Sequence, residues 1–146
     1  MNLNLSLSEI MTKTVRTVNS QDKLKVIKEI FDQNSYQHIP VTRDKRLVGI
    51  VSYKDFLHVS YGASLVKATE EEINSLIYHT ILVGEIMTKN VYTLKSSQTI
   101  LEAISLFESN KFHAIPIVEK EKLVGIVTTF DLISFMKKTN FSGQLS

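Results

Sequence analysis

The chain has 146 residues, of which 43% are hydrophobic and 22% are charged, with a formal net charge of +2 and no cysteine. This composition excludes a disordered chain and supports one packed domain, or two small halves that share a core. The small charge, spread over interspersed acids and bases, excludes a basic nucleic-acid-binding stripe, and the lack of cysteine excludes disulfides and thiolate metal sites.

The sequence carries no signal for a membrane. No apolar run approaches the roughly 20 residues that a spanning helix needs. The first residues, MNLNLSLSEI, lack the basic start and the long apolar stretch of a secretion signal. We therefore expect a cytoplasmic protein that has neither membrane nor nucleic acid as a partner.

An internal repeat organises the chain. The second half repeats the first at a constant offset of 76 positions: EIMTKTVRTV from Glu9 matches EIMTKNVYTL from Glu85, YQHIPV matches FHAIPI, and LVGIV from Leu47 recurs from Leu123. Two like units of this kind can close a shared core around a pseudo-two-fold axis.

Each repeat predicts the same elements in the same order. A single helical turn (8–11 and 84–87) precedes a short strand, VRTV or VYTL, and then a helix with Ser20 or Ser96 as its N-cap. A strand entered through proline, a turn (RDKR or EKEK) and a glycine-bearing strand form a hairpin before the final helix. We expect an α/β (α+β) fold in which each repeat is a small three-stranded sheet with two helices.

The segment between the repeats is predicted to be structured. Thr69 and Glu72 form a capping box, which starts a helix that carries Ile73, Leu76 and Ile77 on one side. The end of the chain, KKTNFSGQLS, has no periodicity and is expected to be loose. The predicted organisation is a first repeat at 8–60, a helical connector at 61–83, a second repeat at 84–136 and a tail at 137–146.

The glycine-bearing strands lead into the candidate site. They lie in LVGIVSYKD (47–55) and LVGIVTTFD (123–131), and a glycine inside a strand indicates that something approaches the backbone closely. Ser52 and Thr128 can cap the helices that follow. Asp55 and Asp131 then lie in the first helical turn, where free amides make a ready anion site.

Two tandem copies of a unit that opens like IMT…V.T, continues with.IPV and ends with LVGIV(S/T)..D resemble a pair of CBS domains. This regulatory module is named after cystathionine β-synthase and is also called a Bateman module. The combination at a constant offset over 8–136 carries the resemblance, rather than any single motif. The resemblance implies two units packed sheet against sheet, with two equivalent clefts that in many members bind AMP, ADP, ATP or S-adenosylmethionine.

The resemblance further implies a homodimer that regulates a partner protein without being a catalyst, and we expect a stand-alone module with no attached enzyme. Each cleft borrows residues from both repeats. The first cleft groups Thr12, Thr14, Arg16, Tyr36, His38, Ile39 and Pro40 with Thr128 and Asp131. The second groups Thr88, Asn90, Tyr92, Phe112, Ala114, Ile115 and Pro116 with Ser52, Lys54 and Asp55.

These residue types suit an adenosyl ligand. A carboxylate can accept hydrogen bonds from both ribose hydroxyls, and Ser52 or Thr128 can donate to a phosphate oxygen. Ile39 or Ile115, each with an aromatic neighbour, can sandwich adenine, and backbone groups near His38 and Ala114 can read the edge of the base.

The two clefts differ in one charge. Lys54 directly precedes Asp55, whereas Phe130 holds the matching position before Asp131. A carboxylate near a phosphate repels it unless a cation intervenes. The Asp55 cleft is therefore predicted to tolerate more phosphate charge, while the Asp131 cleft can recruit Arg16 or His38.

The same residues also have structural explanations. Asp55 and Asp131 can be helix-start acids that complement the helix dipole, Ser52 and Thr128 can be caps only, and the glycines can serve packing only. A ligand-free dimerisation module is therefore the alternative function. The sequence contains no Gly-x-Ser-x-Gly, P-loop or GxGxxG motif and no cysteine nucleophile, and its four histidines are scattered, so we predict neither an enzyme nor a metal site.

Overall fold

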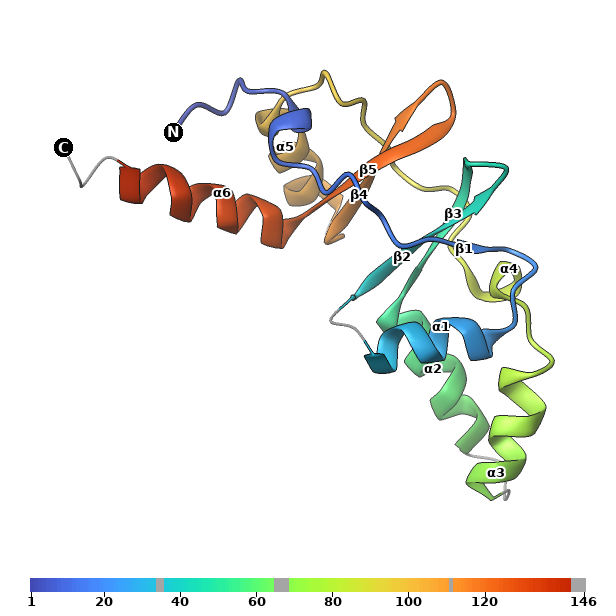
Figure 1. The fold of residues 1–146 in the computed structure, drawn as a ribbon. Helices are drawn as coiled ribbons and strands as arrows, with labels where there is room; N and C mark the ends of the chain where they lie inside the picture. Colours follow the sequence, from blue (N-terminus) through green and yellow to red (C-terminus); the bar gives the residue numbers. More distant parts are fainter. Residues whose placement is uncertain (34–35, 65–68, 111, 143–146) are drawn as a thin grey trace. The chain divides into compact units, whose positions relative to one another are not determined.

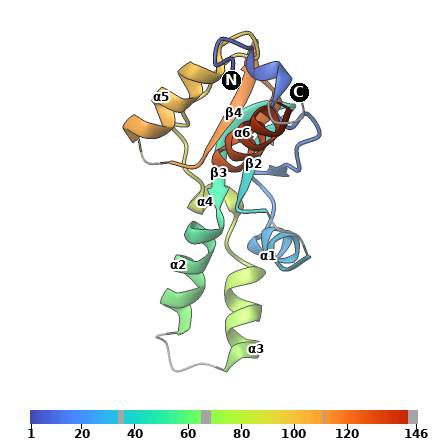
Figure 2. The same ribbon diagram turned by 90° about the vertical axis from the view of Figure 1, so that its left-hand side faces the viewer.

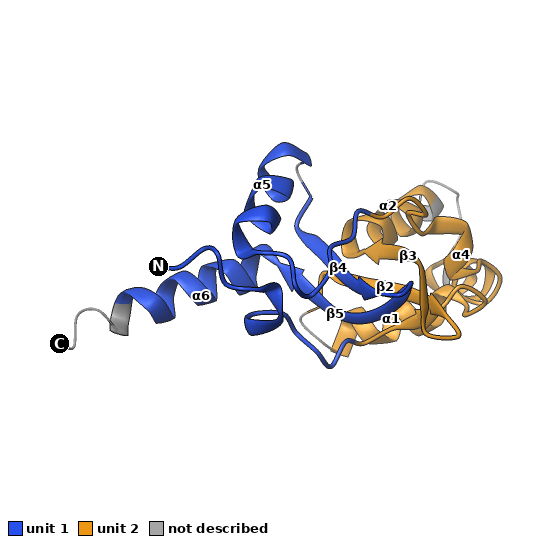
Figure 3. Ribbon diagram, turned by 90° about the horizontal axis from the view of Figure 1, so that it is seen from above, with its two compact units in different colours: residues 1–15, 92–146 blue, residues 16–91 orange. Residues whose placement is uncertain are grey.

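A computed structural model describes residues 1–33, 36–64, 69–110 and 112–142 of the chain (Figure 1). It divides into two compact units: unit 1 joins Met1–Val15 to Tyr92–Ser146, and unit 2 is Arg16–Val91 (Figure 3). Neither unit is one sequence repeat. Each combines the opening segment of one repeat with the remainder of the other.

Unit 2 contains the three-stranded sheet and two helices predicted for the first repeat, although β1 overlaps the predicted strand VRTV only at Val18. Strand β1 pairs in parallel with β2, and β2 pairs antiparallel with β3. The elements are β1 (Val18–Asn19), α1 (Leu24–Gln33), β2 (His38–Arg43), β3 (Arg46–Ser52), α2 (Tyr53–Ser64), α3 (Glu70–Ile73), η2 (Asn74–Tyr78) and α4 (Val83–Ile86). In Figure 2, α2 and α3 both run away from the strands of this unit.

Unit 1 repeats this order with a weaker first strand. Its elements are η1 (Leu7–Glu9), α5 (Ile100–Asn110), β4 (Ala114–Glu119), β5 (Lys122–Thr128) and α6 (Thr129–Ser142). The strand predicted at VYTL is reduced to an isolated parallel bridge between Leu94 and Ile117. The second repeat therefore has two strands and a bridge, because only one residue of that segment pairs.

The two predicted hairpins are confirmed, and they share one register. Pro40 lies opposite Ile50, and Pro116 lies opposite Ile126. The strands begin at His38 and Ala114, as HIPV and AIPI predict, and each proline is the third residue of its strand rather than the first. Leu94 donates its N–H to the carbonyl of Pro116. Proline has no N–H of its own, so accepting through its carbonyl is the only backbone hydrogen bonding open to it.

Each unit has its own hydrophobic core. The core of unit 2 packs α1 against β2 and β3, and the core of unit 1 packs α5 against β4 and β5. Val83, from the opening turn of the second repeat, is fully buried in unit 2. Leu7, its counterpart in the first repeat, is fully buried in unit 1. The opening segments therefore complete the cores of the units into which they are exchanged.

The strand glycines mark where the opening segments cross. The backbone of Thr12 exchanges two hydrogen bonds with Ile126, of 2.9 and 3.0 Å, and Thr88 does the same with Ile50. A Cβ on Gly125 would lie 2.8 Å from Met11 Sδ and 3.0 Å from the Thr12 carbonyl oxygen. The close approach predicted for the glycines is thus made by the chain itself.

The predicted helix caps at Ser20 and Ser96 are wrong. Helices α1 and α5 begin four residues later, at Leu24 and Ile100. Ser96 instead donates both its N–H and its hydroxyl to Glu119, at 2.9 and 2.8 Å. These hydrogen bonds, from the side chain first and then the backbone, lower the pKa of Glu119.

Two further predictions, the apolar face of the connector helix and the loose tail, are partly wrong. Thr69 and Glu72 do form the predicted capping box, with hydrogen bonds of 2.8 and 3.2 Å. Leu76, however, is 72% exposed and does not share a buried face with Ile77. Helix α6 continues to Ser142, so the loose tail is wrong for 137–142, and 143–146 lie outside the described residues. Within the described ranges, no helix has the length and apolar character to cross a bilayer.

We expect Gly49→Ala and Gly125→Ala each to lower the free energy of unfolding by about 1 to 3 kcal/mol, because backbone atoms of the crossing segments block the new methyl group. Gly62→Ala on α2 is the control, since nothing lies within 4 Å of its added Cβ, and it should stabilise the chain by about 0.5 to 1 kcal/mol. Urea unfolding of the three variants measures the difference, and equal effects at all three positions would contradict this account of the strand glycines.

Candidate functional site

The candidate site is built around two capping boxes that place a carboxylate at the start of a helix. At α2, the N–H of Ser52 donates to Asp55 Oδ2 at 3.0 Å, and the N–H of Asp55 donates to Ser52 Oγ at 3.0 Å. Both side chains are half-buried. The predicted cap at Ser52 is confirmed.

The box at α6 has one additional hydrogen bond. The N–H and the hydroxyl of Thr128 both donate to Asp131 Oδ2, at 2.7 and 2.8 Å, and the N–H of Asp131 donates to Thr128 Oγ1 at 3.2 Å. The predicted cap at Thr128 is therefore confirmed as well. The Thr128 hydroxyl proton is directed at Asp131, so it can donate to a ligand only after it leaves that carboxylate.

Two other helices of the chain use the same box with glutamate. Thr69 pairs with Glu72 at α3, and Thr99 pairs with Glu102 at α5, where these hydrogen bonds lower the pKa of Glu102. Only the boxes that follow the glycine-bearing strands contain the shorter aspartate, among the boxes of the described residues. Capping alone is therefore satisfied by either acid in this chain.

The exchanged segments bring part of each predicted site together. In unit 1, Thr12 pairs with Ile126, which lies two residues before Thr128 in β5, and Thr14 follows on the same segment. In unit 2, Thr88 pairs with Ile50, two residues before Ser52 in β3. Asn90, Lys54 and Asp55 belong to the same unit as Thr88.

The pre-proline residues lie one strand away from the caps of their own repeats. Across the hairpins His38 pairs with Ser52, and Ala114 pairs with Thr128. Ile39 and Ile115 are fully buried in their cores, so neither presents side-chain surface to a ligand. Pro40 and Pro116 are buried beside them.

Two matching pairs of site residues, Tyr92 with Phe112 and Arg16 with Tyr36, have different surroundings in the two repeats. Tyr92 stacks on Phe112 with ring centroids 5.5 Å apart. Their counterparts in the first repeat, Arg16 and Tyr36, form no such stacked pair. They line a cavity of about 230 Å³ together with Val26, Glu29, Ile30 and Gln33 of α1. We call this cavity the Arg16 pocket.

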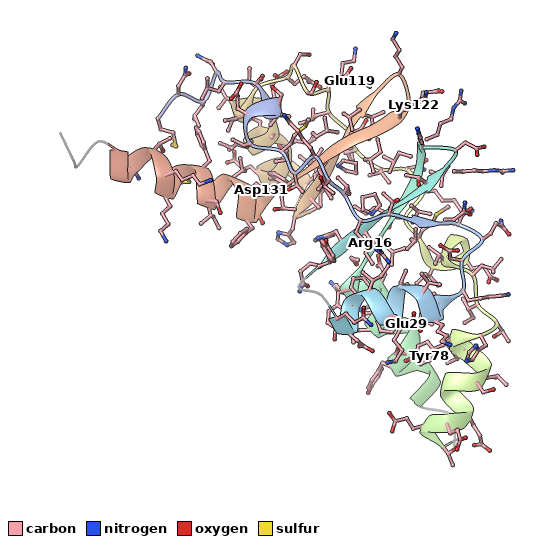
Figure 4. All side chains as sticks on the ribbon, viewed as in Figure 1. Arg16, Glu29, Tyr78, Glu119, Lys122 and Asp131 are labelled. Atoms are coloured by element: carbon pink, nitrogen blue, oxygen red, sulfur yellow. The ribbon has the colours of Figure 1, made fainter. Side chains whose placement is uncertain are left out.

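Sequence reasoning missed the four α1 residues of the Arg16 pocket. Their spacing places them along one face of α1. In the sequence Ile30 recurs with Leu24, Ile27 and Phe31 at helical spacing, which predicts a core position. Ile30 is indeed only 3% exposed, but that spacing gave no sign that the neighbouring polar positions face an open cavity. Figure 4 shows Arg16 on the extended segment before β1 and Glu29 on α1.

The two side chains that distinguish the predicted clefts, Lys54 and Phe130, are both accessible. Lys54 is exposed, and Phe130 is 72% exposed.

Among the described residues, no three histidine, aspartate or glutamate side chains gather into a group that could hold a metal ion. The prediction of no metal site remains a prediction.

A chain of aromatic rings connects the start of α2 to the connector in unit 2. Tyr53, directly after Ser52, packs edge-on against Phe31 at 5.2 Å and lies 6.3 Å from Phe56. Phe56 in turn stacks on Tyr78 at 5.8 Å, and the Tyr78 hydroxyl bonds Ser60 at 3.0 Å. Tyr78 belongs to η2, so the first turn of α2 and the connector are in one packed cluster.

Comparison with known proteins identifies both repeats. The family model of the CBS domain matches residues 7–62 and 83–138. A CBS domain-containing protein of Dictyostelium discoideum is 27% identical over 134 residues, which cover 90% of this chain and 91% of the relative. An inosine-5′-monophosphate dehydrogenase of Thermoplasma acidophilum is 26% identical over 88% of this chain, which spans only 23% of that enzyme.

Solved structures show the same fold. CBSX2 in complex with AMP has a TM-score of 0.75 at 24% identity, covering 92% of this chain and 98% of that one. The CBS domain pair of protein MJ0100, in complex with 5′-methylthioadenosine and S-adenosyl-L-methionine, has a TM-score of 0.71 at 21% identity and covers 90% and 99%. The MJ0100 structure is itself a pair of CBS domains.

Substituting Asp131 measures how much the capping box at α6 contributes to the stability of the chain. Asp131→Ala should lower the free energy of unfolding by about 1 kcal/mol, because the two hydrogen bonds that Asp131 Oδ2 accepts from the N–H and the hydroxyl of Thr128 are lost. Asp131→Glu should change it by less than about 0.5 kcal/mol, since Glu72 and Glu102 fill the same position in this chain. Thermal or urea unfolding measures both, and a loss with glutamate as large as that with alanine would show that the aspartate itself is required for capping.

Proposed function

Because the chain belongs to the CBS domain family, whose model matches both repeats, we propose that it is a regulatory module that binds an adenosyl ligand and is not an enzyme. The ligand, which is AMP, ADP, ATP or S-adenosylmethionine, enters one or both of the predicted clefts. A partner protein then reads the resulting conformational change. AMP bound to CBSX2, and 5′-methylthioadenosine with S-adenosylmethionine bound to the MJ0100 pair, support this class of ligand.

The observation that carries the proposal is the state of the two helix-start carboxylates. Asp55 and Asp131 each engage Oδ2 in the cap, and neither Oδ1 has a partner in the described part of the chain. A carboxylate oxygen of this kind can accept a hydrogen bond from a ribose hydroxyl while the cap stays intact. Aspartate at both positions, where glutamate serves other caps, supports a role beyond capping.

Signalling to a partner requires that a ligand favours one conformation of the module over another. The aromatic cluster of unit 2 offers a route, because Tyr53 follows the Ser52 cap and Tyr78 lies in the connector. A ligand that shifts the first turn of α2 would change the packing of Phe56 against Tyr78. The connector is the surface on which we expect a partner to sense this change.

A second candidate function is supported by exposed apolar side chains on α6. Phe130, Ile133 and Met136 are 72%, 62% and 45% exposed at helical spacing. Such a face favours association with another copy of the chain. We therefore propose a homodimer in either case, and a dimerisation module without a ligand is the alternative. A cytoplasmic location stays a prediction.

Thermal melts separate the two candidates. AMP, ATP or S-adenosylmethionine at 100 times its dissociation constant should stabilise the chain by about 2.7 kcal/mol. The Asp55→Glu, Asp131→Glu double variant is the control, because it keeps both caps but moves both carboxylates and should lose the shift. Unchanged melting with every nucleotide, together with a dimer in sedimentation analysis, would favour the dimerisation module.

The charge difference between the clefts predicts their preference for phosphate. Lys54→Ala should weaken ATP binding by up to about fivefold, the effect of one exposed charge pair, and it should weaken AMP binding less. Phe130→Ala is the matched control at the equivalent position of the other repeat and should leave ATP affinity unchanged. Calorimetry measures both variants, and an unchanged ATP affinity in Lys54→Ala would refute the assignment.

A further inference from the structure

The Arg16 pocket lies wholly within unit 2 and contains both a positive and a negative side chain. Its cavity of about 230 Å³ is lined by Arg16 and Tyr36 and by Val26, Glu29, Ile30 and Gln33 of α1. Water has a share of about 30 Å³ in the liquid, so the cavity has room for a group of several heavy atoms. Buried Ile30 forms part of its apolar lining.

The polar groups of the pocket are available to a ligand. Arg16, Gln33 and Tyr36 have no hydrogen-bond or ion-pair partner for their side chains among the residues that the structure describes. Within the described ranges Glu29 has an ion pair only with Lys25, at 4.0 Å, where both side chains are more than half exposed. Arg16 and Glu29 therefore line one cavity without neutralising each other.

The second repeat shows that the fold does not require this charge pair. The positions that match Arg16 and Glu29 are Tyr92 and Ser105. Tyr92 stacks there on Phe112, the counterpart of Tyr36. One repeat thus has an aromatic pair where the other has an open cavity with a guanidinium and a carboxylate.

We propose that the Arg16 pocket binds the α-amino-acid arm of an adenosyl thioether or sulfonium, a class that includes S-adenosylmethionine and S-adenosylhomocysteine. The ligand carboxylate pairs with Arg16, and its ammonium group pairs with Glu29. This assignment rests on the proposed function, because Tyr36 and Arg16 also belong to the predicted adenosyl cleft. A ligand seated against Tyr36 extends its arm over the apolar lining towards α1.

The signs of the two charges decide between ligand classes. A zwitterionic arm gains from Arg16 and from Glu29 together. A phosphate chain gains from Arg16 but is repelled by Glu29, because like charges in one pocket disfavour each other. The pocket therefore favours an amino-acid arm over a polyphosphate.

Calorimetry with three probes tests the proposal on the full chain in the Asp55→Glu background, which is expected to lose binding at the other cleft. S-adenosylhomocysteine and 5′-methylthioadenosine are both uncharged at sulfur and differ by the amino-acid arm, while AMP carries a phosphate. The arm should strengthen binding by about tenfold, since each exposed charge pair contributes a factor of up to about five. Equal affinity for the two thioethers would overturn the proposal.

Variants then assign the effect to the two charges. Glu29→Gln should weaken S-adenosylhomocysteine by about threefold and strengthen AMP, whereas Arg16→Gln should weaken both. Lys25→Gln, one turn away on α1, is the matched control and should leave the preference for the arm unchanged. An arm preference that survives both pocket variants would overturn the proposal, and so would weaker AMP binding in Glu29→Gln.

The outcomes distinguish this inference from the proposed function. Binding of AMP or 5′-methylthioadenosine without a gain from the arm refutes the amino-acid site and leaves the nucleotide-binding module intact. Absence of binding by all three probes, and by ADP, ATP and S-adenosylmethionine in the wild-type chain, refutes both.

Discussion

The structure depends on the crossing of each opening segment over the glycine of the other repeat's strand. At both crossings the contact consists of a two-way backbone bridge, a methionine side chain and a buried apolar residue. Hydrogen bonds of this kind hold a segment in one register, and any side chain at Gly49 or Gly125 would push it away. The crossings complete both cores, and they also place Thr12 and Thr88 on the strands that end at Thr128 and Ser52.

The two repeats have kept the same framework and have diverged in the side chains around it. Register, caps and crossings recur at equivalent positions. The charged groups do not: Lys54 matches Phe130, and Arg16 and Glu29 match Tyr92 and Ser105. Because the framework tolerates either set, these substitutions are free to tune what each repeat binds. On the proposed function, a module with two such repeats can respond to two ligands of different charge.

The repeat in the sequence predicted most of the fold, including the hairpins and the caps at Ser52 and Thr128. Its errors have local causes. Ser20 and Ser96 looked like caps because serine precedes an apolar periodicity, but a further turn of backbone lies between them and the helices. The end of the chain continues as helix α6 to Ser142 although its sequence lacks periodicity.

The candidate site was predictable only in part. Asp55 and Asp131 follow a visible motif, and their caps confirm the local geometry. Cavity-lining residues such as Glu29 carry no motif, because their role depends on which side chain the preceding extended segment places opposite α1. The sequence could also not reveal that the side chains of Ile39 and Ile115 are fully buried in the cores. Such facts arise from packing among segments that are distant in the sequence.

The exchange of opening segments also sets an order for folding during synthesis. Unit 2 is one continuous stretch, Arg16–Val91, so it can fold as soon as that stretch has left the ribosome. Unit 1 needs both the first residues and those after Tyr92. At about 5 to 20 residues per second, Leu7 waits for seconds before its partners on α5 and β5 are made. During that interval the nascent chain carries an apolar segment around Leu7 that its partners have not yet covered, and a chaperone could bind it there.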